Sequence, residues 1–226
     1  MSHDNRFTPC MHILPQAQTA LWPLLRPIAG LGFVLYGGTA IALRLGHRQS
    51  VDFDFFIEEP LDKTVLLDAL PLAADATVLQ DRPNTWTLLL RPIPGQDDYV
   101  KISFFGTIGF GRYGQPQWTD DGVLKVASLD DLMATKVKVL LQRIEAKDYR
   151  DIAAMLRAGV SLERGLSVAR QMFGSNFQPS ESLKAMTWFE GGDLSSLTDE
   201  ERNTLVDHST RVGSLPIVEK IQDVLQ

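Results

Sequence analysis

A glycine pair followed by two spaced aspartates constrains this chain more than any other feature. Residues 35–56 read Leu-Tyr-Gly-Gly-Thr-Ala-Ile-Ala-Leu-Arg-Leu-Gly-His-Arg-Gln-Ser-Val-Asp-Phe-Asp-Phe-Phe. The pattern predicts a strand, a glycine turn, a short helix that ends at Gly46 and a second strand. Gly37 and Gly38 lack Cβ, so a ligand can approach the backbone closely, and Thr39 is placed to cap the helix. Unpaired N–H groups at the start of such a helix favour phosphate. The competing interpretation is a plain turn before a packed helix, because short glycine motifs are weak signals.

The two aspartates predict a metal site. Asp52 and Asp54 stand at i and i+2 of the second strand, so both carboxylates lie on one face, with Val51, Phe53 and Phe55 on the other. Neighbouring carboxylates repel each other unless a cation lies between them, and hard oxygen ligands suit Mg²⁺. A solvated acidic strand edge is the alternative, but the aromatic run favours a core strand whose carboxylates need a partner. Together the two motifs predict a site for a Mg²⁺-bound nucleoside triphosphate.

A helix predicted from Ser128 carries an inward-facing lysine. Ser128 and Asp131 form a start that resembles a capping box. Lys136 falls within the apolar stripe of this helix, made by Leu129, Leu132, Met133 and Leu140. A lysine on such a stripe is costly unless it meets an anion or a cavity, or unless its stem packs while its ammonium group reaches water. The sequence leaves both interpretations open.

These motifs carry a family resemblance. The segment from Tyr36 to Phe56 resembles the signature of the AbiEii/AbiGii-type nucleotidyltransferase toxins, which belong to the DNA polymerase β-like nucleotidyltransferase superfamily. A second block, residues 130–136 with residues 143–151, is similar to the family's downstream Lys and Lys/Arg-Asp-x-x-Asp motifs. The match covers about residues 30–160.

The resemblance implies a role for each matching residue. Asp52 and Asp54 would hold Mg²⁺, and Lys136 would contact the triphosphate. Gly37, Gly38, Thr39 and Arg48 would bind the nucleotide. Asp148, the acid that follows the basic residue, would contribute to catalysis, although it could instead cap a helix.

One position departs from the superfamily pattern. Related enzymes usually carry a third metal-binding carboxylate on a later strand, which here corresponds to residues 99–105. An acid is expected near Ser103, and none is there; Asp97 and Asp98 lie just before the strand. This departure leaves open base catalysis from elsewhere, weaker activity, or a module that binds nucleotide without transferring it.

The expected fold is α/β (α+β), with a nucleotidyltransferase-type mixed sheet core in residues 1–120 and a helical region in residues 121–226 that completes the active-site cleft. Helices are predicted over residues 16–25 and 61–70, with Pro27 ending or kinking the first, and a hairpin is predicted from the strands 85–91 and 99–105. The glycine-rich segment 106–122 reads as a loop.

The expected activity is Mg²⁺-dependent transfer of a nucleoside monophosphate from a nucleoside triphosphate to an acceptor hydroxyl on RNA, such as tRNA, or on protein. Family analogy implies a toxin of a toxin–antitoxin or phage-defence system, with a cognate antitoxin. Alternatives are a non-catalytic nucleotide-binding module and an aminoglycoside-type small-molecule nucleotidyltransferase. The net charge of −6 fits a cationic small substrate somewhat better than RNA, although a local patch at Arg44, His47 and Arg48 could bind phosphate.

Composition indicates the class of protein, its location in the cell and the cysteine chemistry that is possible. The chain has 226 residues, 44% of them hydrophobic, which describes a soluble globular protein. No apolar run approaches the length of a membrane span, and the polar segment Met1–Pro9 has no signal-like region, so a cytoplasmic protein is expected. Cys10 is the only cysteine, which excludes an internal disulfide and a cysteine zinc cluster.

Overall fold

The computed structural model describes residues 5–226, and the chain divides into two compact units. Unit 1 holds the chain up to Gly111, the segment Gln115–Ala127 and the last residues Asp223–Gln226. Unit 2 holds Arg112–Gly114 and Ser128–Gln222. Residues 1–4 belong to the polar segment on which the cytoplasmic expectation rests, and they lie outside the described residues.

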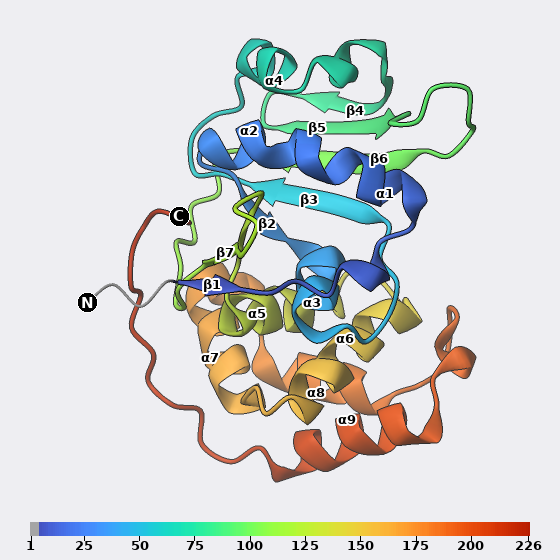
Figure 1. The fold of residues 1–226 in the computed structure, drawn as a ribbon. Helices are drawn as coiled ribbons and strands as arrows, with labels where there is room; N and C mark the ends of the chain where they lie inside the picture. The colour runs from blue at the N-terminus through green and yellow to red at the C-terminus, as the bar shows by residue number, and fades with distance from the viewer. Residues whose placement is uncertain (1–4) are drawn as a thin grey trace. The chain divides into compact units, whose positions relative to one another are not determined.

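Unit 1 is built on a mixed sheet whose order within the described residues is β1-β7-β8-β2-β3-β6-β5-β4 (Figure 1). The strands are β1 (Arg6–Phe7), β2 (Val34–Tyr36), β3 (Asp52–Phe56), β4 (Thr77–Arg82), β5 (Thr85–Leu90), β6 (Val100–Phe105), β7 (Gln117–Thr119) and β8 (Lys125–Val126). Strand β3 lies between β2, to which it is antiparallel, and β6, to which it is parallel. The expected mixed α/β class is confirmed, and the motif-bearing strand is an inner one.

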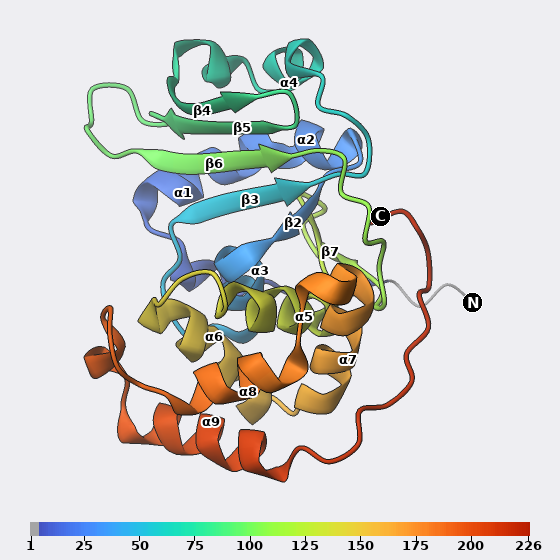
Figure 2. The same cartoon turned by 180° about the vertical axis from the view of Figure 1, so that it is seen from behind.

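One face of this sheet is covered by the N-terminal helices. Helix α1 (Gln16–Leu21), the 3-10 turn η2 (Trp22–Leu25) and α2 (Arg26–Gly30) follow one another along it. Trp22 packs on Phe53 with ring centroids 6.4 Å apart, and Phe55 stacks on Phe104 at 5.6 Å. Figure 2 views the sheet from its other side, with β3 and β6 in front of α1 and α2. The fully buried rings of Phe53 and Phe55 therefore fix which face of β3 points to the core.

Most elements predicted around the sheet are present with shifted ends. The β5–β6 hairpin is confirmed, and the helix expected over 61–70 is α4 (Lys63–Ala69), capped by the Asp62 carboxylate. Pro27 does not end the first helix; it stands in the first turn of α2, where its missing N–H costs nothing. Strand β4 was not expected, because all six of its residues are exposed and carry no apolar alternation. Strand β7 also lies inside the segment 106–122 that was expected to be a loop.

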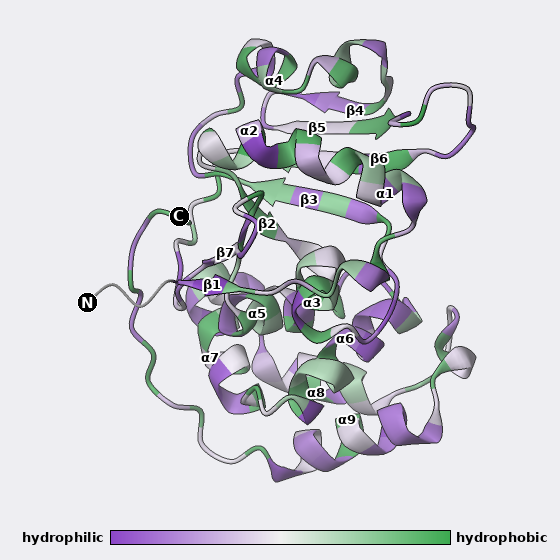
Figure 3. Cartoon of the chain, in the orientation of Figure 1, coloured by the Kyte–Doolittle hydropathy of each residue, from purple (hydrophilic) through white to green (hydrophobic). Residues whose placement is uncertain are grey.

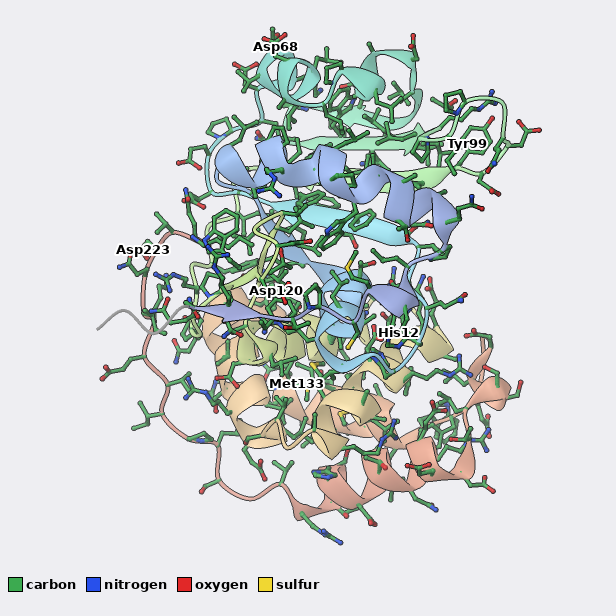
Figure 4. All side chains as sticks on the ribbon, in the orientation of Figure 1. His12, Asp68, Tyr99, Asp120, Met133 and Asp223 are labelled. Atoms are coloured by element: carbon green, nitrogen blue, oxygen red, sulfur yellow. The ribbon has the colours of Figure 1, made fainter. Side chains whose placement is uncertain are left out.

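Unit 2 is helical. Its helices are α5 (Leu129–Val139), α6 (Ala146–Arg157), α7 (Leu162–Phe173), α8 (Pro179–Thr187) and α9 (Asp199–Arg211). Helix α5 starts as predicted, with the Ser128 hydroxyl accepting from the N–H of Asp131 at 3.1 Å. Helices α5 and α7 pack closely where Gly165 faces Met133, labelled in Figure 4, since a Cβ at Gly165 would lie 2.2 Å from the Met133 Cγ.

None of the helices in the described part of the chain is both long enough and apolar enough to cross a bilayer.

Candidate active site

The glycine turn connects β2 to helix α3 (Gly37–Leu45). The helix begins at Gly37 itself, with Tyr36 as N-cap and no side-chain cap, so the predicted capping role of Thr39 is wrong. Thr39 is the third helical residue, and its buried hydroxyl donates to the carbonyl of Asp52 and lies 2.7 Å from the Ser50 hydroxyl. The Thr39 hydroxyl connects α3 to the start of β3 and is therefore not available to a ligand. The backbone N–H groups of the first helical turn are the groups that can bind a phosphate. Gly46 ends the helix in the left-handed conformation, as predicted.

Gly37 and Asp54 approach each other closely. Strand pairing places Tyr36 opposite Asp54, so the residue after Tyr36 turns over the Asp54 side chain. Gly37 adopts a φ of +74°, and a Cβ built there would lie only 2.5 Å from Oδ2 of Asp54. Two features therefore require glycine at position 37: the left-handed backbone conformation, and the Asp54 carboxylate, which leaves no space for a Cβ atom.

The face of β3 opposite the aromatic core carries the two aspartates. Asp52 and Asp54 are partly exposed, whereas the intervening Phe53 is fully buried. Figure 3 shows this alternation as hydrophobic and hydrophilic bands along β3. The expected sharing of one face by the two carboxylates follows directly from the regular pairing of β3.

The neighbouring strand β6 supplies no acid at this face. Its register with β3 places Lys101 beside Asp52 and Ser103 beside Asp54. The Lys101 Nζ donates to Oδ2 of Asp52 at 2.9 Å. Ser103 is buried, with its hydroxyl 3.4 Å from that of Thr87. Ser103, near which the superfamily pattern leads us to expect an acid, thus lies beside Asp54, and Lys101 is a neighbour of Asp52 that the sequence pattern does not predict.

Asp97 and Asp98 do not replace the missing acid. Both are exposed and precede Val100, the first residue of β6. Asp97 lies 3.4 Å from Arg91, whose guanidinium also packs over the Tyr99 ring at the hairpin end (Figure 4). Across residues 5–226 there is no group of three or more His, Cys, Asp or Glu side chains placed to hold a metal ion.

The available donors fit Mg²⁺ bound together with a triphosphate. Two carboxylates on one strand face supply hard oxygen ligands, and Mg²⁺ usually completes its octahedral shell with waters and substrate phosphates. Asp52 and Asp54 are partly open to solvent, so such ligands can reach them.

The basic residues in the last turn of α3 and in the loop that follows it make different contacts. Arg44 faces the sheet, donating to the carbonyls of Ala127 and Val126 and to the side chain of Gln117. Burial lowers the pKa of its guanidinium to about 10. Arg44 is therefore a structural bridge rather than part of an open basic patch. Arg48 lies in the loop beyond Gly46 and donates to the carbonyl of Gln49 at 2.8 Å.

Unit 2 gathers its own charged cluster around Lys136. The Lys136 Nζ lies 2.6 Å from Asp148 and 2.7 Å from Asp151, both on α6. The Lys136 side chain is 6% exposed and both carboxylates are fully buried. Arg143 completes the cluster by donating to both oxygens of Asp148, at 2.7 and 3.0 Å. The lysine on the apolar stripe thus meets anions rather than water, so the snorkelling interpretation is wrong.

Asp148 remains ionised in this cluster. Burial by itself would raise the pKa of its carboxyl, but the hydrogen bonds from Arg143 and the charge and hydrogen bond of Lys136 outweigh it and hold the pKa below its ordinary value. Asp148 stands inside the first turn of α6, whose N-cap is Glu145, so it is not the helix cap that was considered as an alternative. Its partner Lys136 is 12 residues earlier in the chain.

The fold of the chain is similar to the folds of two solved nucleotidyltransferase structures. MenT4, a nucleotidyltransferase toxin from Mycobacterium tuberculosis, superposes with a TM-score of 0.61 at 14% identity, covering 88% of this chain and 84% of that one. A candidate nucleotidyltransferase from H. pylori superposes with a TM-score of 0.58 at 15% identity, covering 86% of this chain and 92% of that one. At such identities the likeness establishes the fold.

The sequence family is more specific. The model of the nucleotidyl transferase AbiEii toxin family, of type IV toxin–antitoxin systems, matches residues 20–209. The chain belongs to this family, and the resemblance seen in its motifs is confirmed. An uncharacterized Aquifex aeolicus protein, aq_aa25, is 28% identical over 173 residues, which cover 74% of this chain and 80% of that protein.

A methyl group at position 37 should disable the aspartate face. We expect Gly37→Ala to displace the Asp54 carboxylate and to lower the free energy of unfolding by about 1–3 kcal/mol, from backbone strain and the close contact. Gly95→Ala is the matched control, since Gly95 has a similar φ of +79° but nothing within 4 Å of its Cβ position. Urea unfolding and Mn²⁺ binding measure the difference. Equal effects of the two substitutions on both measurements would contradict the close contact.

Removing the Lys136 charge should destabilise unit 2. Lys136→Met leaves Asp148 and Asp151 buried with less positive charge nearby, so we expect a loss of about 3 kcal/mol. Lys138→Met, on the same helix but at a more exposed lysine, should cost less than about 1 kcal/mol. Adding Asp151→Asn to Lys136→Met should restore part of the loss. Unfolding curves that are unchanged by Lys136→Met would show that the ion pairs contribute nothing to stability.

Proposed function

We infer that the chain transfers a nucleoside monophosphate from a Mg²⁺-bound nucleoside triphosphate to a hydroxyl group of a macromolecular acceptor. The family is one of nucleotidyltransferase toxins; the metal, the assignment of residues and the acceptor are the parts proposed here. The observation that carries the proposal is the contact between the glycine turn and Asp54 on the two-carboxylate face of β3.

Helix α3 and strand β3 would each have a role in this reaction. The first-turn N–H groups of α3, at Gly37, Gly38 and Thr39, have no acceptor within the helix and would bind phosphate oxygens. Asp52 and Asp54 would hold the cation, and Mg²⁺ bound there would offset the negative charge of the triphosphate and of the leaving pyrophosphate. Transfer of this kind depends mainly on positioning and on electrostatic stabilisation, which a rigid strand beside a helix start can provide.

The residues outside this face are assigned by resemblance. Arg48 would bind the nucleotide, and Lys136 would neutralise charge on the triphosphate, with Asp148 contributing to catalysis. Because Asp148 and Asp151 compensate the charge of Lys136 in the structure, its orientation is held by neighbouring side chains before any ligand arrives. A lysine held in this way loses little conformational freedom when it binds an anion.

The acceptor is proposed to be RNA or protein, and an antitoxin is the partner that membership of a type IV toxin–antitoxin family implies. A net charge of −6 gives no general attraction to nucleic acid, so an RNA acceptor would be bound through local contacts.

A second candidate function is a module that binds nucleotide without transferring it. It is favoured by one observation: the positions of β6 paired with Asp52 and Asp54 hold Lys101 and Ser103 and no acid. Both candidates require Asp52 and Asp54 for nucleotide binding, but only the first yields a covalently labelled acceptor.

The decisive assay offers α-labelled nucleoside triphosphates, one at a time, to the protein together with total RNA and total protein of a cell extract. We expect label in an RNA or protein band, and we expect Asp52→Asn or Asp54→Asn to reduce it about 100-fold or more. Asp81→Asn, which removes an exposed carboxylate on β4, is the control and should retain full activity.

The outcomes separate the two candidates. Label that persists in both Asp52→Asn and Asp54→Asn would refute the site. Triphosphate binding that depends on both aspartates, without any labelled acceptor, would favour the binding module instead. Thermal unfolding of each variant shows whether a loss of label reflects the site or the fold.

A further inference from the structure

The strand beside the two aspartates carries a positive charge where a third negative charge would complete a larger metal site. Strands β3 and β6 run parallel in regular register, so side chains at paired positions lie on the same face. Phe53 and Ile102 are paired and fully buried on one face, whereas Asp52 and Lys101 are paired on the other. Lys101 therefore belongs to the aspartate face by the geometry of the sheet, and not through a chance side-chain contact.

The Lys101–Asp52 pair contributes little to the stability of the fold. The lysine side chain is 38% exposed and the aspartate 30%, and ion pairs that are this open to solvent are weak. The fold therefore does not depend on this ion pair. The charge of Lys101 is thus better explained by what it does at the aspartate face.

Charge and ligand number at this face favour a single divalent cation. Asp52, Asp54 and Lys101 together carry a formal charge of about −1, whereas three carboxylates would carry about −3. An ammonium group repels a nearby cation, and it also occupies an oxygen of Asp52 at 2.9 Å. The described residues offer no third acid at this face to hold a second ion, since Ser103 is buried and neutral.

We propose that the Lys101 ammonium group takes the place of a second divalent cation, so that the aspartate face binds one metal ion instead of two. Lys101 supplies, as a fixed part of the chain, a positive charge beside Asp52, and its three N–H donors can turn from Asp52 towards substrate oxygens. This inference rests on the proposed function, because it takes Asp52 and Asp54 as the metal ligands.

The test counts Mn²⁺ ions by electron paramagnetic resonance and measures their affinity by calorimetry, without nucleotide and then with a non-hydrolysable triphosphate analogue. The parent protein should bind one Mn²⁺ per chain. Lys101→Met should also bind one, about fivefold to tenfold more tightly, because the competing charge is gone. Lys101→Glu should bind two, and Mn²⁺ should raise its melting temperature more than that of the parent.

Lys63→Met is the matched control. It removes a partly exposed lysine that pairs with Asp81 at the β4 edge of the same unit, and it should change neither the number of Mn²⁺ ions nor their affinity. Melting temperatures of all variants without metal check that the fold is kept, which the exposure of Lys101 leads us to expect.

Three results would overturn the inference while leaving the proposed function intact, provided that Asp52→Asn abolishes Mn²⁺ binding. They are two Mn²⁺ ions in the parent, an unchanged affinity in Lys101→Met, or a single Mn²⁺ in Lys101→Glu. A parent that binds no Mn²⁺, or an Asp52→Asn variant that binds it as well as the parent, would overturn the metal site of the proposed function and the inference with it.

Discussion

Strand β3 must bury two phenylalanines and present two carboxylates within five residues, and much of unit 1 is arranged to make this possible. Phe53 and Phe55 need an aromatic core on one side, which Trp22 and Phe104 help to build. Because side chains alternate along a strand, the same packing fixes the direction of Asp52 and Asp54. The cores of natural proteins are rigid on this scale, so the carboxylates are positioned by residues that never meet a ligand.

In unit 2, several charged side chains are buried together. Lys136, Asp148 and Asp151 form a buried cluster in which each charge is tolerated because the others are present, and the more exposed Arg143 pairs with Asp148 at its edge. Replacing such a cluster with apolar residues often costs nothing, so its stability alone does not explain why charged groups stand there. The cluster does fix the orientation of the Lys136 ammonium group, because two carboxylates lie 2.6 and 2.7 Å from it.

The sequence reveals the parts of this site that depend on local periodicity and little of what depends on tertiary pairing. The shared face of Asp52 and Asp54 and the end of α3 at Gly46 follow from spacing and residue type. Thr39 was assigned as a cap because threonine favours that position, but the observed cap is Tyr36, three residues earlier, and the Thr39 hydroxyl binds to β3 instead.

Tertiary partners explain the remaining differences. The anions around Lys136 come from another helix, so no inspection of its own stripe could find them. Lys101 alternates with buried Ile102 and Phe104, which marks it as facing the other side of β6, but its position beside Asp52 depends on a register that only the folded sheet defines. The sequence does not predict strand β4, because an exposed edge strand needs no alternation of apolar residues.

The parallel pairing of β3 with β6 also affects the order in which unit 1 folds during synthesis. The glycine turn and the two aspartates have both been synthesised once the ribosome reaches residue 54. Lys101 follows 49 residues after Asp52, and Val126, which pairs with Leu35 of β2, comes later still. Parallel strands close long loops and pair late, so the glycine turn and the aspartates leave the ribosome before β6, which brings Lys101 beside Asp52, has been synthesised. Translation of the two motifs is therefore separated in time from completion of the sheet around them.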